Sequence, residues 1–270
     1  MENVDLWDRK GGKLTVAESW LCHPDERKSC GACCGLYNYL DHSRKALEHL
    51  LEERTRLFWQ HPLTPEGLKA YREKAQRLHH SSPLCTEIIR CEFLGFVDEG
   101  RRRVGCLLHP ALHGEDLRDA SPYGRELCRE HLCPSHHYLT EGEQRLVAGV
   151  LDDWYLYGLV ITDLDLVRDS LRLVADRLGQ MPSSVDLRHD PFRRALAGFF
   201  SLKERWFFRD HRPRLGKYWF SEGEYRIDHP FDDPWDRILC CLETDPSRWK
   251  EALTVLERTI DRVVRSYPGK

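Results

Sequence analysis

The stretch Ser29-Cys30-Gly31-Ala32-Cys33-Cys34-Gly35 places three thiols within five residues, next to two glycines. Glycine allows the backbone to turn tightly, so that several sulfurs can converge on one point. Thiolates are the ligands that select zinc and iron–sulfur clusters. The stretch therefore predicts a knuckle around a soft metal centre, and the rest of the first half is expected to supply the remaining ligands.

The cysteines are concentrated in that first half. The 270-residue chain has eleven, of which nine precede residue 134 and none lies between 134 and 239. In a reduced compartment such clustering favours metal or redox chemistry over a disulfide framework, and the odd total argues against complete pairing. His109, His113 and His131 are candidate nitrogen ligands. The expected sulfur ligands are Cys30, Cys33, Cys34, Cys91, Cys106, Cys128 and Cys133.

The other cysteines have simpler interpretations. A lone buried cysteine usually behaves as a small hydrophobe, which is the reading favoured for Cys22 and Cys85. Cys240-Cys241 sits in an apolar run and is expected in the core. A redox-active disulfide between Cys30 and Cys33 is an alternative, but no βαβ pattern of the thioredoxin kind surrounds it.

Composition excludes several classes of partner. The net charge of -3 gives no electrostatic reason to expect nucleic acid or an acidic membrane. No apolar run approaches the roughly 18–20 residues that a membrane span needs. The first residues are polar, unlike a signal peptide. We expect a cytoplasmic protein whose partner is a metal ion or cluster, with no nucleic acid and no membrane.

Periodicity predicts a mainly α fold with one small β-hairpin. Two short strands over 92–97 and 104–108 flank the turn residues Asp98-Glu99-Gly100. This hairpin would hold Cys91 and Cys106 near its open end, on adjacent strands.

Helical spacing and capping residues mark the remaining elements. Residues 1–29 are read as a loop-rich lead-in, and 210–240 are left unassigned. The division expected is a cysteine-rich metal-binding module over 1–139 and an α-helical part over 140–270. Helices are predicted over 41–60, 65–79, a short segment carrying Cys128, 140–157, 162–178, 190–208 and 245–263.

Three segments together resemble the YkgJ-type cysteine-cluster family, whose members are described as zinc- or iron-chelating. They are Cys30-Gly31-Ala32-Cys33-Cys34, Cys91-Glu92-Phe93-Leu94 and Cys106-Leu107-Leu108-His109-Pro110. Arg27 and His113 stand where the family pattern has cysteines, and His109 where it has arginine. Either Cys128 and Cys133 replace the missing ligands or His113 ligates directly. The resemblance implies a metal centre and little more.

Three functions follow as hypotheses. The first is a metal-binding protein with an iron–sulfur cluster, or alternatively zinc, in a redox, metal-handling or structural role. The second is a metal-dependent enzyme for electron or methyl transfer, because flagellin lysine methylases are similar in this motif. The third is a zinc-stabilised interaction module. The nucleotide-binding and hydrolase motifs that would favour an enzyme are absent from the sequence.

Overall fold

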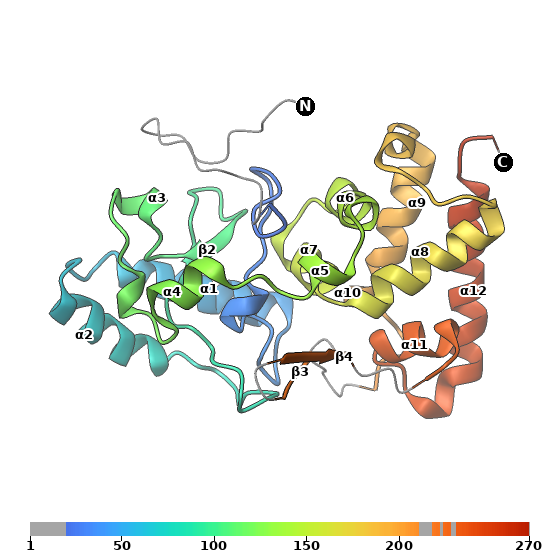
Figure 1. Ribbon diagram of the computed structural model, residues 1–270. Helices are drawn as coiled ribbons and strands as arrows, with labels where there is room; N and C mark the ends of the chain where they lie inside the picture. Colours follow the sequence, from blue (N-terminus) through green and yellow to red (C-terminus); the bar gives the residue numbers. More distant parts are fainter. Residues whose placement is uncertain (1–19, 211–217, 222–223, 228–230, 270) are drawn as a thin grey trace. The chain divides into compact units, whose positions relative to one another are not determined.

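The computed structural model describes residues 20–210, 218–221, 224–227 and 231–269 (Figure 1). Within 211–230 only the backbone of the two strands is described. The predicted mainly α-helical fold with a small antiparallel hairpin is confirmed. Most of the predicted lead-in, residues 1–19, lies outside the described residues. Among the residues described, no helix combines the length and apolar character needed to cross a membrane.

The chain forms two compact units. The first comprises Met1–Leu132 with Asp153–Tyr155, and the second comprises Cys133–Asp152 with Leu156–Lys270. All predicted ligands except Cys133 therefore belong to the first unit. Cys133 belongs to the second.

The first unit is built from short helices around one hairpin (Figure 1). Strands β1 and β2 pair antiparallel, with Leu94 opposite Cys106, as the turn at 98–100 predicts. Thr64 caps the second helix, with Pro65 at its first position. The helices and strands are η1 (Ala32–Cys34), α1 (Arg44–Phe58), α2 (Pro65–Gln76), β1 (Leu94–Phe96), β2 (Val104–Cys106), α3 (Pro110–His113), η2 (Arg118–Ala120) and α4 (Gly124–Glu130).

Helix α1 packs along β1. The Thr55 hydroxyl accepts a 2.8 Å hydrogen bond from the Phe96 amide, so the helix lies directly against the strand. Phe58 belongs to the buried cluster under the hairpin together with Tyr71 from α2 and Phe93. The Tyr71 hydroxyl donates to the Glu92 carbonyl at 2.7 Å. These contacts hold both helices beside the segment that begins at Cys91.

The second unit contains the longer helices. Its last helix, α12, buries Leu256, Ile260 and Val263 along one face, as predicted from their spacing. Helix α11 and strands β3 and β4 lie in the region that the sequence left unassigned. The elements are α5 (Ser135–Tyr138), α6 (Glu141–Val150), α7 (Trp154–Ile161), α8 (Leu164–Leu178), η3 (Ser184–Arg188), α9 (Asp190–Phe200), α10 (Leu202–Arg205), β3 (Tyr218–Ser221), β4 (Glu224–Ile227), α11 (Pro234–Cys241), η4 (Pro246–Arg248) and α12 (Trp249–Arg265).

Three predicted helix boundaries need correction. The helix expected over 140–157 is two helices, because Leu151 adopts an extended backbone after the capping box at Thr140 has started α6. Asp163, not Thr162, caps α8, since the Thr162 hydroxyl already donates to the Gly158 carbonyl at 2.7 Å. The helix expected over 190–208 ends at Phe200, and the short helix α10 follows it.

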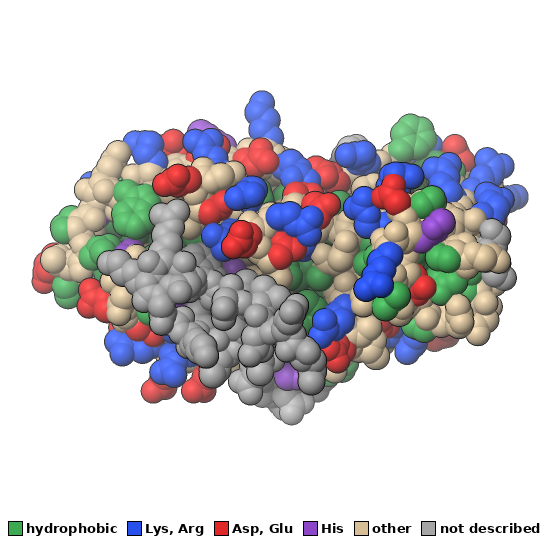
Figure 2. Space-filling model, turned by 90° about the horizontal axis from the view of Figure 1, so that it is seen from above, with side chains coloured by type: hydrophobic (Ala, Val, Ile, Leu, Met, Phe, Trp, Pro, Cys, Tyr) green, Lys and Arg blue, Asp and Glu red, His purple; other side chains and the backbone are tan. Residues whose placement is uncertain are grey.

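A buried ion pair lies in the core of the second unit. Lys203 Nζ is 2.6 Å from Asp163 Oδ2 and donates to the Cys241 carbonyl at 2.7 Å. Asp163 and Asp165 are both buried, as is Cys241, which confirms its predicted core position. On the face shown in Figure 2, Lys and Arg side chains lie next to Asp and Glu side chains over the described part.

Candidate functional site

The knuckle turns tightly, and its second glycine is required by geometry. Gly35 ends η1 in the left-handed region with φ +77. A Cβ at this position would lie 2.4 Å from the Ile89 carbonyl oxygen. The close approach lets the Cys34 carbonyl accept a 3.0 Å hydrogen bond from the Cys91 amide. Two cysteine-bearing segments far apart in sequence are thereby joined through their backbones.

The open end of the hairpin contributes two thiols, one just before β1 and one at the end of β2. Cys91 precedes β1, and Cys106 ends β2 opposite Leu94. The Leu107 amide donates to the Phe93 carbonyl at 2.8 Å and extends the pairing beyond the strands. Both cysteines are therefore at the open end of the hairpin, as the sequence predicts.

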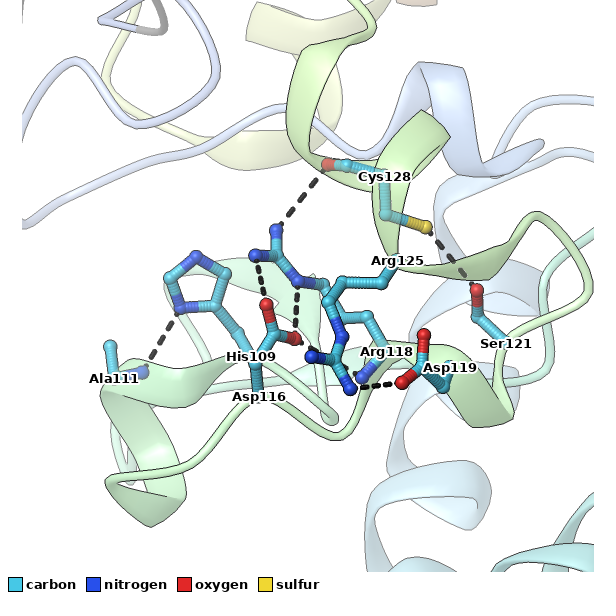
Figure 3. Close-up of polar contacts among 8 residues, drawn as sticks. All are labelled: His109, Ala111, Asp116, Arg118, Asp119, Ser121, Arg125 and Cys128. Carbon is cyan, nitrogen blue, oxygen red and sulfur yellow. Dashed lines mark hydrogen bonds and ion pairs between the residues drawn. The ribbon is translucent and has the colours of Figure 1, made fainter.

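A fourth thiol comes from α4. Cys128 Sγ and Ser121 Oγ are 3.3 Å apart, a hydrogen bond in which either group can donate. Arg118 Nη1 donates to the Cys128 carbonyl at 3.4 Å, while its Nε and Nη2 donate to Asp116 at 2.8 and 2.7 Å (Figure 3). Arg118 thus links the loop that follows α3 to the helix that carries Cys128.

The four sulfurs act on one another electrostatically. Burial raises the pKa of the Cys34 thiol well above its usual value, and Cys91, Cys106 and Cys128 raise it further. Cys22, which the sequence predicts to be a small hydrophobic core residue, also raises the pKa of Cys34. Cys34 and Cys106 both pack against the buried hydrophobic cluster that contains Cys91. The four thiols therefore form a cluster, named here the thiol cluster: Cys34, Cys91, Cys106 and Cys128.

Backbone amides are directed at two sulfurs of the thiol cluster. Burial raises the pKa of Cys91, and the Phe93 amide, by hydrogen bonding to its sulfur, opposes that rise. Burial also raises the pKa of Cys106 to about 11, and the Leu108 amide opposes it in the same way. Each amide is two residues after its cysteine. Donors placed like this stabilise a thiolate more than a thiol.

Aromatic and aliphatic side chains pack around three thiols of the thiol cluster, of which Cys91 is buried and Cys34 and Cys106 are partly buried. Cys91 belongs to a buried hydrophobic cluster with Phe58, Phe93 and Leu107, and Cys34 and Cys106 pack against it. Tyr123 packs against the same cluster, and its hydroxyl donates to the Ile89 carbonyl at 2.8 Å. A charge inside such a region is weakly screened.

The other four predicted ligands have different surroundings. Cys33 is exposed, although its neighbour Cys34 faces inward. The Cys30 amide donates to the Cys22 carbonyl at 2.8 Å. The Cys30 thiol adds to the rise that burial causes in the pKa of Tyr37. His113 Nε2 is 2.6 Å from the Leu107 carbonyl. Cys133 belongs to the second unit.

The thiol cluster is not a closed coordination shell. Among the residues that the structure describes, no three His, Cys, Asp or Glu side chains are arranged so that they could hold a metal ion. The donor set is nevertheless the one that zinc and iron–sulfur clusters select. Coordination would require the four side chains to turn toward a common point.

One buried charged residue of α1 is not predicted from the sequence. Arg54 lies on α1 in the stripe formed by Leu47, Leu50, Leu51 and Phe58, and it is as buried as they are. Its Nη2 is 3.1 Å from the Tyr39 hydroxyl and 2.8 Å from His79 Nε2. The signal in the sequence is an arginine at a position where the helical period calls for an apolar residue.

Comparison with known proteins adds no relative. No family model, no curated protein and no solved structure matches the chain. The likeness to the YkgJ-type family stays a prediction based on the three cysteine segments.

Proposed function

We propose that the first unit binds an iron–sulfur cluster or a zinc ion through the thiolates of Cys34, Cys91, Cys106 and Cys128. The observation that carries the proposal is the packing of Cys34 and Cys106 against the buried cluster that holds Cys91, together with the hydrogen bond from the Cys91 amide to the Cys34 carbonyl. Cys128 also acts on Cys34 and Cys106. Four cysteines are the usual ligand set of a structural zinc site and of both common iron–sulfur clusters. Cys22, which also acts on Cys34, is a candidate substitute ligand.

The chemistry of the site supports a bound cation. Burial and the neighbouring thiols raise the pKa of Cys34 and of Cys106, which favours their protonated forms at neutral pH. A cation reverses that balance, because a ligating thiol loses its proton outright. The Phe93 and Leu108 amides and the Ser121 hydroxyl then have thiolates to donate to. When bound, zinc would supply a structural link and an iron–sulfur cluster would supply electron transfer.

The proposed role is that of a cytoplasmic metal protein whose centre is structural, handles metal or transfers electrons. The free energy of metal binding at such a site also stabilises the folded chain, because the unfolded chain has no preformed site. The ligands come from η1, the two ends of the hairpin and α4, so one centre would tie together most of the first unit.

Metal, iron and acid-labile sulfide analysis of the anaerobically purified chain tests the proposal. A coloured protein with absorbance near 400 nm (a general iron–sulfur signature) and matched iron and sulfide indicates a cluster. A colourless protein with one zinc per chain indicates zinc. Serine variants of the four ligands should lose the metal, whereas Cys240→Ser in the second unit should keep it. A wild-type chain without metal after anaerobic preparation would contradict the proposal.

A further inference from the structure

The four thiols of the thiol cluster are held in place in two different ways. Three of them belong to segments whose backbones are hydrogen-bonded to one another. The Cys91 amide donates to the Cys34 carbonyl at 3.0 Å, and the Leu107 amide, which follows Cys106, donates to the Phe93 carbonyl at 2.8 Å. These contacts join η1 to the start of the hairpin, and the two sides of the hairpin to each other. We call Cys34, Cys91 and Cys106 the three-thiol frame.

The fourth thiol, Cys128, is on a helix that lies outside this backbone framework. At the two ends of α4, the Gly124 amide donates to the Ser121 carbonyl at 3.2 Å, and the His131 amide donates to the Leu127 carbonyl at 3.0 Å. Within the part of the chain that the structure describes, no backbone-to-backbone hydrogen bond joins α4 to η1 or to the hairpin. The helix is therefore positioned through side chains.

Two of these side chains hold Cys128 itself (Figure 3). Ser121 Oγ is 3.3 Å from Cys128 Sγ and also accepts a 3.1 Å hydrogen bond from the Gly124 amide. Arg118 Nη1 donates to the Cys128 carbonyl at 3.4 Å. Segments that are held by few contacts open more readily than the core of a domain. We therefore expect α4 to open while the hairpin stays intact.

The base of α4 is anchored, and a glycine follows the anchor. Tyr123, the residue before α4, packs against the buried cluster that contains Cys91, and its hydroxyl donates to the Ile89 carbonyl at 2.8 Å. Gly124 comes next with φ +75, and a Cβ at this position would meet no atom within 4 Å. Glycine adopts left-handed and other backbone conformations at little cost. The chain can therefore turn at Gly124 while Tyr123 stays in place, and this turn moves Cys128.

We propose that α4 is a lid that closes the metal site. The three-thiol frame binds the cation first, and α4 then turns at Gly124 to bring in Cys128, whose thiol gives its proton to the solvent as the sulfur binds. In the described part of the chain no three potential ligands are arranged to hold an ion, so closure requires movement, and α4 is the element that can move. The inference rests on the proposed function and adds its regulation, because the lid sets how fast the metal enters and leaves.

Hydrogen exchange tests the movement of the lid in the full chain, first stripped of metal under reducing conditions and then saturated with Zn²⁺. Without metal, the amides of α4 should exchange at least about tenfold faster than those of Cys91 and Leu107, because the lid opens without breaking the frame. Zinc should slow exchange in α4 more than at Cys91 and Leu107. Zinc binding that leaves exchange in α4 unchanged would overturn the inference.

A matched pair of glycine variants tests the hinge. Gly124→Ala puts an alanine into a left-handed backbone without a clash, which disfavours the closed lid. Transfer of bound zinc to an excess of chelator should be at least about fivefold faster than in wild type. Gly114→Ala is the control, because Gly114 has φ +78 and equally open surroundings but ends α3. Its rate of zinc transfer should stay within about twofold of wild type.

A pair of serine variants tests the lid without straining the backbone. Ser121→Ala removes the contact with Cys128 Sγ and should speed zinc transfer by about twofold to tenfold. Ser135→Ala removes a buried hydroxyl of the second unit, which donates to the Ile161 carbonyl at 2.7 Å. This control should transfer zinc at the wild-type rate. If Gly124→Ala does not fold, the serine pair decides.

The outcomes separate the lid from the metal site itself. Equal rates of zinc transfer within either matched pair would overturn the lid, while a wild type that binds zinc would leave the proposed function standing. Slower transfer in Gly124→Ala than in Gly114→Ala would overturn the lid too. A wild type that binds neither zinc nor a cluster would overturn both.

Discussion

The amide of Cys91 donates a 3.0 Å hydrogen bond to the carbonyl of Cys34. This contact is possible because Gly35 turns the chain away immediately after Cys34, with no side chain to strike the backbone of Ile89. The first cysteine segment and the hairpin are therefore held together by backbone geometry before any metal is considered.

Gly35→Ala should disrupt the junction. The alanine would have to adopt the left-handed backbone of Gly35, and its Cβ would lie 2.4 Å from the Ile89 carbonyl oxygen. We expect a loss of more than about 2 kcal/mol in the free energy of unfolding of the first unit. Gly114→Ala is the control, since it has φ +78 and open space around it. It should cost about 1 kcal/mol. Urea unfolding measures both, and equal losses would refute the steric argument.

Arg118→Met should loosen the helix that carries Cys128. The substitution removes the donors to Asp116 and to the Cys128 carbonyl. The expected loss is about 1–3 kcal/mol, and the Cys128 thiol of the metal-free chain should react faster with a thiol reagent. Arg125→Met removes only an exposed partner of Asp119 and should cost less than about 1 kcal/mol. Unchanged Cys128 reactivity in Arg118→Met would exclude the positioning role.

The same ion pair has a defined pH dependence. The hydrogen bonds from Arg118 lower the pKa of Asp116 to about 2, below its value of about 3.9 in an unfolded chain. Because the pKa of Asp116 is lower in the folded chain than in the unfolded chain, the ion pair stabilises the fold at pH values above the unfolded pKa. This stabilisation is lost as the pH falls through about 2. The stability difference between wild type and Asp116→Asn should therefore shrink between about pH 5 and 2. A carbon-13 titration that places the Asp116 pKa near 4 would contradict this.

Lys203→Met should destabilise the second unit strongly. It leaves Asp163 buried without its cation, which costs about 3–5 kcal/mol for a buried pair. Lys203→Met combined with Asp163→Asn should recover part of that loss, because no uncompensated charge remains. Arg177→Ala breaks a more exposed pair with Asp261 and should cost less than about 1 kcal/mol. A double variant less stable than Lys203→Met would be inconsistent with the charge argument.

Sequence patterns predicted the fold where spacing alone decides it. Thr64-Pro65 marks the start of α2, and the turn at 98–100 marks the hairpin that holds Cys91 and Cys106 at its open end. The break between α6 and α7 was missed because the apolar spacing continues through Leu151. Helix α11 was missed because 210–240 is rich in aromatic residues and proline, which obscure the helical period.

The candidate site was predicted only in part, for a local reason. Which of two adjacent cysteines faces inward depends on the backbone turn, and η1 directs Cys34 toward the interior while Cys33 stays exposed. Cysteine counting cannot make that distinction. The burial of Arg54 was missed because its partners, Tyr39 and His79, are distant in sequence and are revealed only by three-dimensional contacts.

The adjacent cysteines provide the most direct test of the central claim. Cys33→Ser and Cys34→Ser make the same chemical change one residue apart, at an exposed and an inward-facing position. The measurement is the metal content per chain after anaerobic purification. The buried thiol cluster predicts that Cys33→Ser keeps the wild-type metal content and that Cys34→Ser loses most of it. Equal retention in both variants, or loss in Cys33→Ser alone, would contradict it.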